Sequence, residues 1–246
     1  MPDLSWTLPV ARWSFWSPAV AETAEVAFID PMMRRRLSSL SRMALKVAHD
    51  CVQNVPQARV VFASRHGELR RTTDILHGIE AGKPVLPNAF SLSVLNAMSG
   101  LFGIARQDRS PANAISAGPE TLGYALLEAY AQYTEEPTVP VLLVYADEPA
   151  DGAYGEVDHE VQQGALALLL DAGQVAQGHL ACTVCEIEHE TEHEIEHEIE
   201  HEAGKAGVTH FATQSAALHH CLDTQSAAAW QHAGAIWQWG WHVSAV

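Results

Sequence analysis

The sequence predicts an α/β fold in which helices cover both faces of a central sheet. Short apolar runs with strand character, such as 60–64 and 139–146, alternate with segments whose apolar residues recur at helical spacing. Strands that are apolar throughout are typical of a sheet buried on both faces. The chain has 246 residues, 48% of them hydrophobic and 18% charged. We therefore expect one folded domain over residues 1–246, with one sizeable core.

The first half of the chain contains the clearest helical patterns. An aromatic N-terminal segment indicates a strand, and apolar residues at helical spacing then predict a helix over 31–51. The run 60–64 predicts a short strand, and a turn leads from it into a helix over 69–79 that glycines and a proline terminate. A further helical stretch covers 91–105.

The second half begins with a short strand over 113–117, a helix over 122–133 and an apolar strand over 139–146. Two more strands are predicted over 164–171 and 180–187, with an Asp-Ala-Gly turn signal after the first of them. Strands and helices of this length in alternation favour a layered fold.

The C-terminal tail places Trp237, Trp239 and Trp241 on one face of an extended segment, because they recur with a period of two. Aromatic burial of this kind is usually structural. We expect the three rings to cover a sheet edge or a hydrophobic flank.

The net charge of −16 is concentrated in one segment. Nine of the 30 acidic residues are glutamates that alternate between positions 186 and 202, so removing them from the net −16 leaves −7 for the rest of the chain. A protein whose main partner is nucleic acid needs clustered Lys and Arg to neutralise phosphates. Nucleic acid is therefore not expected as a partner.

Nothing in the sequence indicates export or membrane insertion. The first twenty residues lack a basic start, a continuous apolar core and a cleavage site, so no secretory signal is predicted. The longest apolar runs, 139–146 and 165–170, are far shorter than the ~20 residues that cross a bilayer, so no membrane span is expected. Four cysteines in a chain of this length do not indicate a disulfide scaffold. We expect a cytoplasmic protein with reduced thiols.

A low-complexity Glu/His repeat covers residues 183–202 within the domain. Its histidines recur every four residues, so in a helix they would stand one turn apart and could bind zinc or nickel. The candidate metal ligands are His189, His193, His197 and His201, with Cys182 and Cys185 just upstream of the first repeating unit, which begins at Glu186. Like charges in every unit instead favour a solvated loop or a ragged strand extension, and a lone CxxC is a weak zinc signal. No cofactor is expected.

The segment 116–123 has the pattern of a sharp turn between a strand and a helix, the kind of elbow that exposes a catalytic nucleophile above a buried sheet. The turn holds Gly118 and Pro119 and no nucleophile. Taken alone, Gly118 is better explained as a turn glycine that serves a conformation with positive φ. The scaffold of a catalytic site is thus predicted without its reactive atom.

Five separated motifs resemble, in their order, the N-terminal half of β-ketoacyl synthases. They are 34–38 (RRRLS), 87–97 (PNAFSLSVLNA), 100–105 (GLFGIA), 116–118 (SAG) and 144–149 (VYADEP). The set is more closely similar to the short, stand-alone ketosynthase-like proteins called chain length factors, which are found with aryl polyene biosynthesis. The resemblance covers roughly Trp6 to Ala172 and does not include the Glu/His repeat. It implies a layered thiolase-like fold truncated to about one half of a ketosynthase.

The resemblance also implies a protein that does not catalyse condensation on its own. Active ketosynthases have a cysteine where this chain has Gly118, at a helix N-terminus that stabilises the thiolate. They also carry two decarboxylating histidines in a C-terminal half that we expect this chain to lack. Pro119 removes one backbone N–H from an oxyanion hole. Leu86 and Leu95 stand where family members often have Ser and His.

The family's dimer architecture implies an interface for this chain. Ketosynthases are dimers in which the elbow strand pairs across the interface and the preceding helix lines the partner's acyl tunnel. Here 110–116 would be the interfacial strand and 93–105 the tunnel-lining helix, with Phe102 as a stop for the growing acyl chain and room beside it at Gly103. The implied interface and tunnel residues are Ser93, Leu95, Asn96, Met98, Leu101, Phe102, Ile104 and Ser116.

The implied function is that of a chain length factor in a heterodimer with a full-length β-ketoacyl synthase, whose acyl or polyene product it tunes. An acyl carrier protein would dock chiefly on the catalytic partner, and the chain could form a homodimer when that partner is absent. In a half-size protein, the tryptophans of the tail are expected to help cap the surface that the missing half would cover.

Two other functions stay open from the residues. The first is a self-associating scaffold or metal-binding protein in which the Glu/His repeat is the working part. The second is a hydrolase that uses Ser64 and His66, which lie together on a predicted turn but without an identified acid to orient the histidine.

Overall fold

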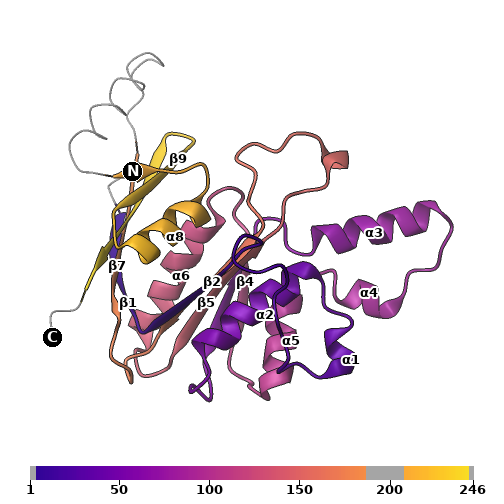
Figure 1. Cartoon of the computed structure of the whole chain (residues 1–246), viewed down its shortest axis with the longest axis horizontal. Helices are drawn as coiled ribbons and strands as arrows, with labels where there is room; N and C mark the ends of the chain where they lie inside the picture. Colours follow the sequence, from indigo (N-terminus) through magenta and orange to yellow (C-terminus); the bar gives the residue numbers. More distant parts are fainter. Residues whose placement is uncertain (1–3, 187–207, 244–246) are drawn as a thin grey trace, which may run out of the picture.

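The structure is a computed structural model that describes residues 4–186 and 208–243. In this part of the chain the strands form two five-stranded mixed sheets (Figure 1). In spatial order, the first sheet contains β2 (Arg12–Trp16), β6 (Gly164–Leu170), β5 (Val141–Asp147), β3 (Arg59–Ala63) and β4 (Ala112–Ile115). The second contains β1 (Leu4–Val10), β7 (Gly178–Glu186), β10 (Ala235–His242), β9 (Ala228–His232) and β8 (Thr209–His210).

The helices form layers around these sheets (Figure 1). One face of the first sheet is covered by α2 (Ser39–Cys51) and α5 (Ala97–Arg106), and the space between the two sheets is filled by α6 (Thr121–Glu135) and α8 (Gln214–Thr224). The remaining elements are α1 (Pro31–Arg34), α3 (Leu69–Glu80), α4 (Pro87–Ser91) and the 3₁₀ helix η1 (Gly152–Tyr154). No helix in the described ranges has the length and apolar character needed to cross a bilayer.

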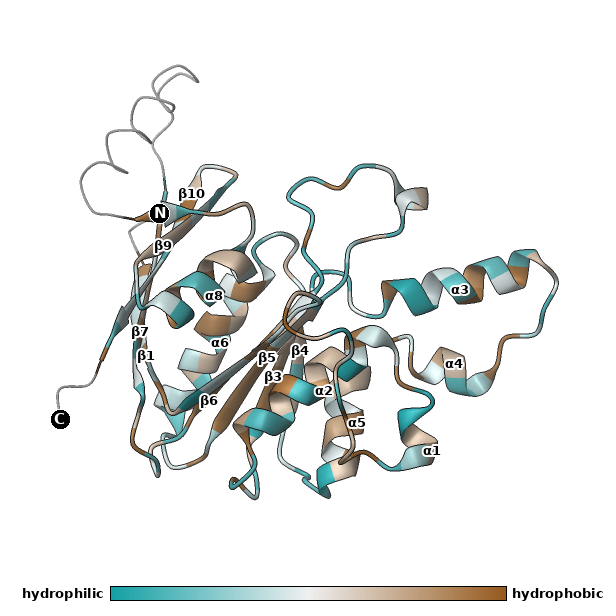
Figure 2. Cartoon of the chain, viewed as in Figure 1, coloured by the Kyte–Doolittle hydropathy of each residue, from teal (hydrophilic) through white to brown (hydrophobic). Residues whose placement is uncertain are grey.

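Strand β5 contributes side chains to two hydrophobic cores, one on each face of the first sheet. Every residue of β5 is buried, and Figure 2 shows the central strands as strongly hydrophobic. Leu142 and Val144 point into the core beneath α2 and α5, whereas Leu143 and Tyr145 point into the core shared by α6, α8 and the second sheet. The prediction of a sheet buried on both faces is confirmed.

The tryptophans of the tail lie inside the second core, not at an edge. Trp237 and Trp239 are 2% and 1% exposed, and Trp241 is 9% exposed. They sit on β10, which pairs with β7 on one side and β9 on the other. The sheet edge was the wrong position, because β10 is a central strand of the second sheet, and the rings instead pack on the hydrophobic flank that includes α6 and α8. That they help to cap the surface of a missing half stays a prediction.

Several element boundaries differ from the predictions. The helix expected over 31–51 is two helices, because Ser38 starts a new one by accepting a hydrogen bond from the Ser41 amide at 2.9 Å. The stretch 91–105 contains the end of α4, a non-helical link and α5. The structure also has α8 and β9, which no sequence pattern predicted.

Candidate functional site

The connection between β4 and α6 is a sharp elbow. Gly118 has a φ of +60°, and no atom lies within 4 Å of the position that a Cβ would take, so the backbone conformation rather than space requires glycine. Thr121 closes the turn: its Oγ1 accepts a hydrogen bond from the Ala117 amide at 2.9 Å and donates one to the Gly118 carbonyl at 2.7 Å. The predicted sharp turn is confirmed.

The elbow presents no side-chain nucleophile. Position 118 has no side chain, and Pro119 has no N–H to donate to an oxyanion. The Ser116 hydroxyl donates to the Arg65 carbonyl at 2.9 Å, which ties the elbow to the turn after β3. Among the described residues, no hydroxyl or thiol of the elbow pairs with a base. The arrangement positions α6 and the end of β4.

A buried carboxylate holds the neighbouring turn after β3. Asp147 is fully buried and accepts hydrogen bonds from Ser64 Oγ at 2.8 Å, the Arg65 amide at 2.7 Å and the His66 amide at 3.1 Å. Burial raises the pKa of Asp147, and hydrogen bonds from these groups and from the Tyr145 hydroxyl oppose that rise. This network fixes the backbone against which the elbow rests.

Replacing Asp147 with asparagine is expected to lower the free energy of unfolding by about 2–4 kcal/mol, because an amide cannot accept from all of these donors and leaves a buried N–H unpaired. Urea denaturation followed by circular dichroism measures the change. Asp74→Asn, at an exposed position on α3, is the matched control and should change stability by less than about 0.5 kcal/mol. Equal stability of the two variants would contradict a structural role for the Asp147 network.

The side chains of Ser64 and His66 have different partners, although the two residues lie close together in sequence. Ser64 Oγ is buried, donates to Asp147 and accepts from the Gly67 amide at 2.8 Å. His66 Nε2 lies 2.8 Å from Oε1 of Glu160. Burial alone raises the pKa of Glu160, but hydrogen bonds from His66 and from backbone amides hold it below its usual value. These contacts give no support to a hydrolase built on Ser64 and His66.

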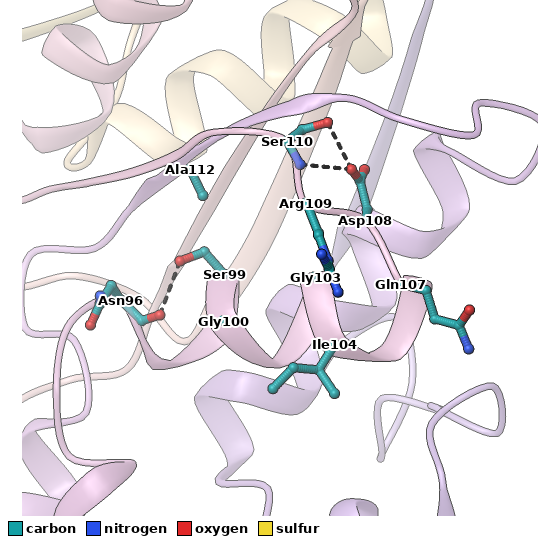
Figure 3. Close-up of a pocket in the computed structure, with 10 residues that line it drawn as sticks. All are labelled: Asn96, Ser99, Gly100, Gly103, Ile104, Gln107, Asp108, Arg109, Ser110 and Ala112. Carbon is teal, nitrogen blue, oxygen red and sulfur yellow. Dashed lines mark hydrogen bonds between the residues drawn. The ribbon is translucent and has the colours of Figure 1, made fainter.

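The outward face of α5 forms a wall of an open groove of about 700 Å³ (Figure 3). Asp108 shapes its rim by accepting hydrogen bonds from the hydroxyl and amide of Ser110, at 2.7 and 2.9 Å, and from the Ala58 amide at 3.1 Å. Burial alone raises the pKa of Asp108, but these bonds hold it below its usual value. The lining residues are Asn96, Ser99, Gly100, Gly103, Ile104, Gln107, Asp108, Arg109, Ser110 and Ala112.

The predicted tunnel residues divide between two faces of α5. Met98, Leu101 and Phe102 point into the first core, and Phe102 is only 2% exposed. Asn96 and Ile104 line the groove, where Ile104 is 66% exposed. Helical periodicity separates the two sets, so Phe102 lies in the protein's own core behind the groove.

Ser93 and Leu95 lie before α5, although the prediction included them in the helix. Ser93 Oγ donates to the Phe90 carbonyl at 2.8 Å. Leu95 is half-buried against the first core and against Gly67, where an added Cβ would come within 3.1 Å of the Leu95 side chain. Both residues therefore shape the link between α4 and α5.

The segment predicted as the interfacial strand lies at an edge of the first sheet. In the described part of the chain β4 pairs only with β3, and its four residues are exposed or half-buried. An edge strand leaves backbone N–H and C=O groups available to a further strand.

An exposed apolar surface covers α3, α4 and the outward face of α5. Figure 1 shows α3 and α4 projecting from the body on the side away from the second sheet, and Thr73 is the one residue of α3 that is buried. Large apolar side chains on α3, α4, α5 and their links are 41–66% exposed: Leu76, Ile79, Val85, Leu86, Phe90, Val94 and Ile104. We call this set the α3–α5 apolar surface. Such a concentration is typical of a protein interaction site.

The two candidate metal-binding cysteines point in different directions. Cys182 and Cys185 lie three residues apart on β7, so their side chains leave opposite faces of the strand. Cys182 is buried in the second core, and burial raises the pKa of its thiol well above the usual value. The geometry does not favour a metal shared by this pair. The candidate ligands His189, His193, His197 and His201 lie outside the described residues.

Three acidic residues with structural roles near the site had no role predicted for them, although Asp147 lies within the 144–149 motif. Asp108 has a local signal, because an aspartate that accepts from the amide two residues later is a common turn pattern. Asp147 is the last residue of the apolar strand β5, which places it at the end of that strand. Glu160 has no local signal, since its partner His66 lies 94 residues away.

The sequence and the fold of this chain are similar to those of known proteins. The family described as β-ketoacyl synthase, N-terminal domain, matches residues 10–240. No curated protein matches the chain. A solved chain from the complex of ketosynthase ApeO with its chain length factor ApeC, from Xenorhabdus doucetiae, has a TM-score of 0.71 and 24% identity, covering 96% of this chain and 99% of that one.

Two further structures share the architecture at lower identity. The ishigamide ketosynthase/chain length factor gives a TM-score of 0.60 at 12% identity, covering 96% of this chain and 99% of that one. A β-ketoacyl synthase from Burkholderia phymatum STM815 gives 0.51 at 13% identity, covering 64% of this chain and 49% of that one. The layered thiolase-like fold, at about half the size of a ketosynthase, is confirmed. Since the family match covers most of its length, the chain belongs to the family of the β-ketoacyl synthase N-terminal domain.

Proposed function

We propose that this protein is a chain length factor, a non-catalytic subunit that pairs with a full-length β-ketoacyl synthase and shapes its acyl tunnel in polyketide or fatty-acid-type biosynthesis of aryl polyenes. The observation that carries the proposal is Gly118, which occupies the elbow at positive φ where active ketosynthases have cysteine. A residue without a side chain cannot hold the acyl group as a thioester. The similarity to chains from ketosynthase and chain length factor complexes supports the pairing.

The free edge of β4 and the α3–α5 apolar surface support the same interface. A strand from the partner can extend the first sheet by pairing with β4, which satisfies backbone groups on both chains. The part of the α3–α5 apolar surface on α5, the helix that contacts β4, would then leave water. Full burial of one Ile, Leu or Phe side chain contributes about 1.5–3 kcal/mol, so Phe90 and Ile104, which are 65% and 66% exposed, are the strongest contributors expected.

The groove beside α5 supports the role in setting chain length. Gly100 faces it, with no atom within 4 Å of the place where a Cβ would lie, and Ile104 projects into the same space. These outward residues are the ones that can touch an acyl chain in the partner's tunnel. Phe102 affects the groove indirectly, because its packing in the first core sets the position of α5.

The proposal also covers the acyl carrier protein, the state of this chain without its partner, and the cellular compartment. The acyl carrier protein docks chiefly on the ketosynthase, because carrier proteins are acidic and this chain has a net charge of −16. When the ketosynthase is absent, a homodimer can form through the same β4 edge. The complex works in the cytoplasm, where the cysteines stay reduced.

Co-expression with a β-ketoacyl synthase from the same source tests the proposal. We expect a one-to-one complex by size-exclusion chromatography with mass detection. Condensation should require the partner's nucleophilic cysteine, and the complex should release products of a narrower range of chain lengths than the ketosynthase alone. A monomer that does not bind the ketosynthase, or condensation activity that persists when the partner's cysteine is replaced, would overturn the proposal.

A further inference from the structure

Two histidines and two carboxylates meet beside the elbow. Asp158 and His159 lie in the loop between η1 and β6, and His232 ends β9. One ligand atom from each of these three residues lies within 4.8 Å of the other two. Glu120, directly after Pro119 in the elbow, places Oε1 3.8 Å from Nδ1 of His232. Segments far apart in sequence therefore bring metal-binding side chains to one place.

The loop that carries the first two residues is held in position. The Arg65 guanidinium donates hydrogen bonds to the carbonyls of Asp158 and His159, at 2.9 and 2.6 Å. His159 has a φ of +48°, a conformation that residues with side chains seldom adopt. Arg65 is itself fixed, because its amide donates to the buried Asp147. The His159 side chain is thus presented from a backbone that other parts of the fold hold in place.

The second histidine is also oriented before any ligand arrives. The His232 ring stacks on Trp230, with 5.5 Å between ring centres, and meets the His159 ring edge to face at 4.9 Å. Its Nδ1 is buried and has no hydrogen-bond partner among the described residues. A small movement of Glu120 would satisfy this nitrogen. A carboxylate bound to one nitrogen of a histidine is a common arrangement behind a metal-bound imidazole, because it fixes the ring and its tautomer.

We propose that His159, His232 and Asp158 form a binding site for a divalent transition metal, with zinc as the best-suited ion, and that Glu120 positions His232. Two imidazoles and one carboxylate are a ligand set that zinc accepts, with a water molecule in the fourth position. Ligand atoms on one tetrahedral zinc ion lie about 3.3 Å apart, about 1.6 times the bond length of 2.0–2.1 Å, so side-chain rotation has to draw these atoms together by up to about 1.5 Å.

The charges around the cluster fit a cation. Asp158 and Glu120 carry two negative charges, which exceed the single positive charge of Arg65. Asp158 is 84% exposed and the two histidines are 35% and 21% exposed, so the ion can enter from solvent while the imidazoles stay partly shielded. A bound ion would link the loop before β6, the end of β9 and the elbow. This role is independent of whether the chain pairs with a ketosynthase.

Zinc titration of the full chain by calorimetry, without any partner protein, tests the site. The Glu/His repeat offers competing imidazoles, so the reference is the full chain with H189Q, H193Q, H197Q and H201Q. This reference should bind one zinc ion. His159→Asn, which tolerates positive φ, and His232→Phe, which keeps the stacking on Trp230, should each weaken binding at least 100-fold. Glu120→Gln should weaken it 10- to 100-fold, as expected for a group behind a ligand.

His77→Ala, on the exposed surface of α3, is the control and should leave zinc binding unchanged. Cobalt provides a second readout, because a four-coordinate site gives intense visible absorption that the His159 and His232 variants should lose. Circular dichroism of each variant establishes that it is folded. A reference chain that binds no zinc, or folded His159→Asn and His232→Phe variants that bind it at full strength, would overturn the proposal.

Discussion

Replacing Ile104 with aspartate is expected to abolish stable pairing with the ketosynthase and to leave the fold of this chain unchanged. Ile104 is 66% exposed on α5, so in the isolated chain the new carboxylate stays in water and should alter the free energy of unfolding by less than about 0.5 kcal/mol. In the complex the same carboxylate would be desolvated among apolar groups. We expect a cost of about 3 kcal/mol or more, which weakens binding more than 100-fold.

Calorimetric titration of the two purified subunits measures this loss, and size-exclusion chromatography shows whether a complex survives. Val175→Asp is the matched control. Val175 is 91% exposed in the turn between β6 and β7, so it introduces the same charge away from α5. Unchanged affinity of Ile104→Asp, or an equal loss in Val175→Asp, would show that the α3–α5 apolar surface is not the interface.

Gly123→Ala is expected to destabilise the protein by about 2–3 kcal/mol, although alanine favours a helix by about 1 kcal/mol. Gly123 lies on α6 directly under the Trp237 ring. An added Cβ would come within 2.4–2.8 Å of three ring carbons, and Trp237 is only 2% exposed, so the ring has no free space to move into. The second sheet must therefore shift away from α6. Urea denaturation measures the loss.

Two further variants separate this contact from a general effect of alanine. Gly78→Ala on α3 has nothing within 4 Å of its Cβ and should stabilise the chain by up to about 1 kcal/mol. In a Trp237→Leu background the ring is gone, so Gly123→Ala should no longer cost stability there. If Gly123→Ala is equally harmful with and without the ring, the contact with Trp237 does not explain the glycine.

The first sheet was largely predictable, whereas in the second sheet β1, β7 and β10 had a strand pattern but β8, β9 and the adjoining α8 did not. Strands β3, β5 and β6 are continuous apolar runs because both of their faces are buried, and hydrophobicity marks such strands directly. In the second sheet, β9 contributes small buried residues such as Ala228 and Ala229, and α8 has only a short apolar stripe. These patterns are weak, and the pairing of β1 with β7 joins segments that lie far apart in the sequence.

The candidate site was also predictable only in part. The elbow and the glycine in it follow from a local motif, so the sequence indicated both. The tunnel residues were assigned to one helix, but the sequence did not indicate which face of that helix points into the core. Phe102 lies in the core because α5 packs against the first sheet through residues 98, 101 and 102. An apolar residue that faces a core and one that faces a partner look alike in sequence.

The sequence by itself determined the apolar strands of the first sheet, the elbow and the absence of a nucleophile at Gly118, because each depends on residues that are neighbours along the chain. Only the tertiary structure decided that Asp147 holds Arg65 and that His159 meets His232. It also decided which outward side chains flank the free edge of β4. These contacts join segments that are distant in sequence, and local pattern carries no information about which distant partners the path of the chain brings together.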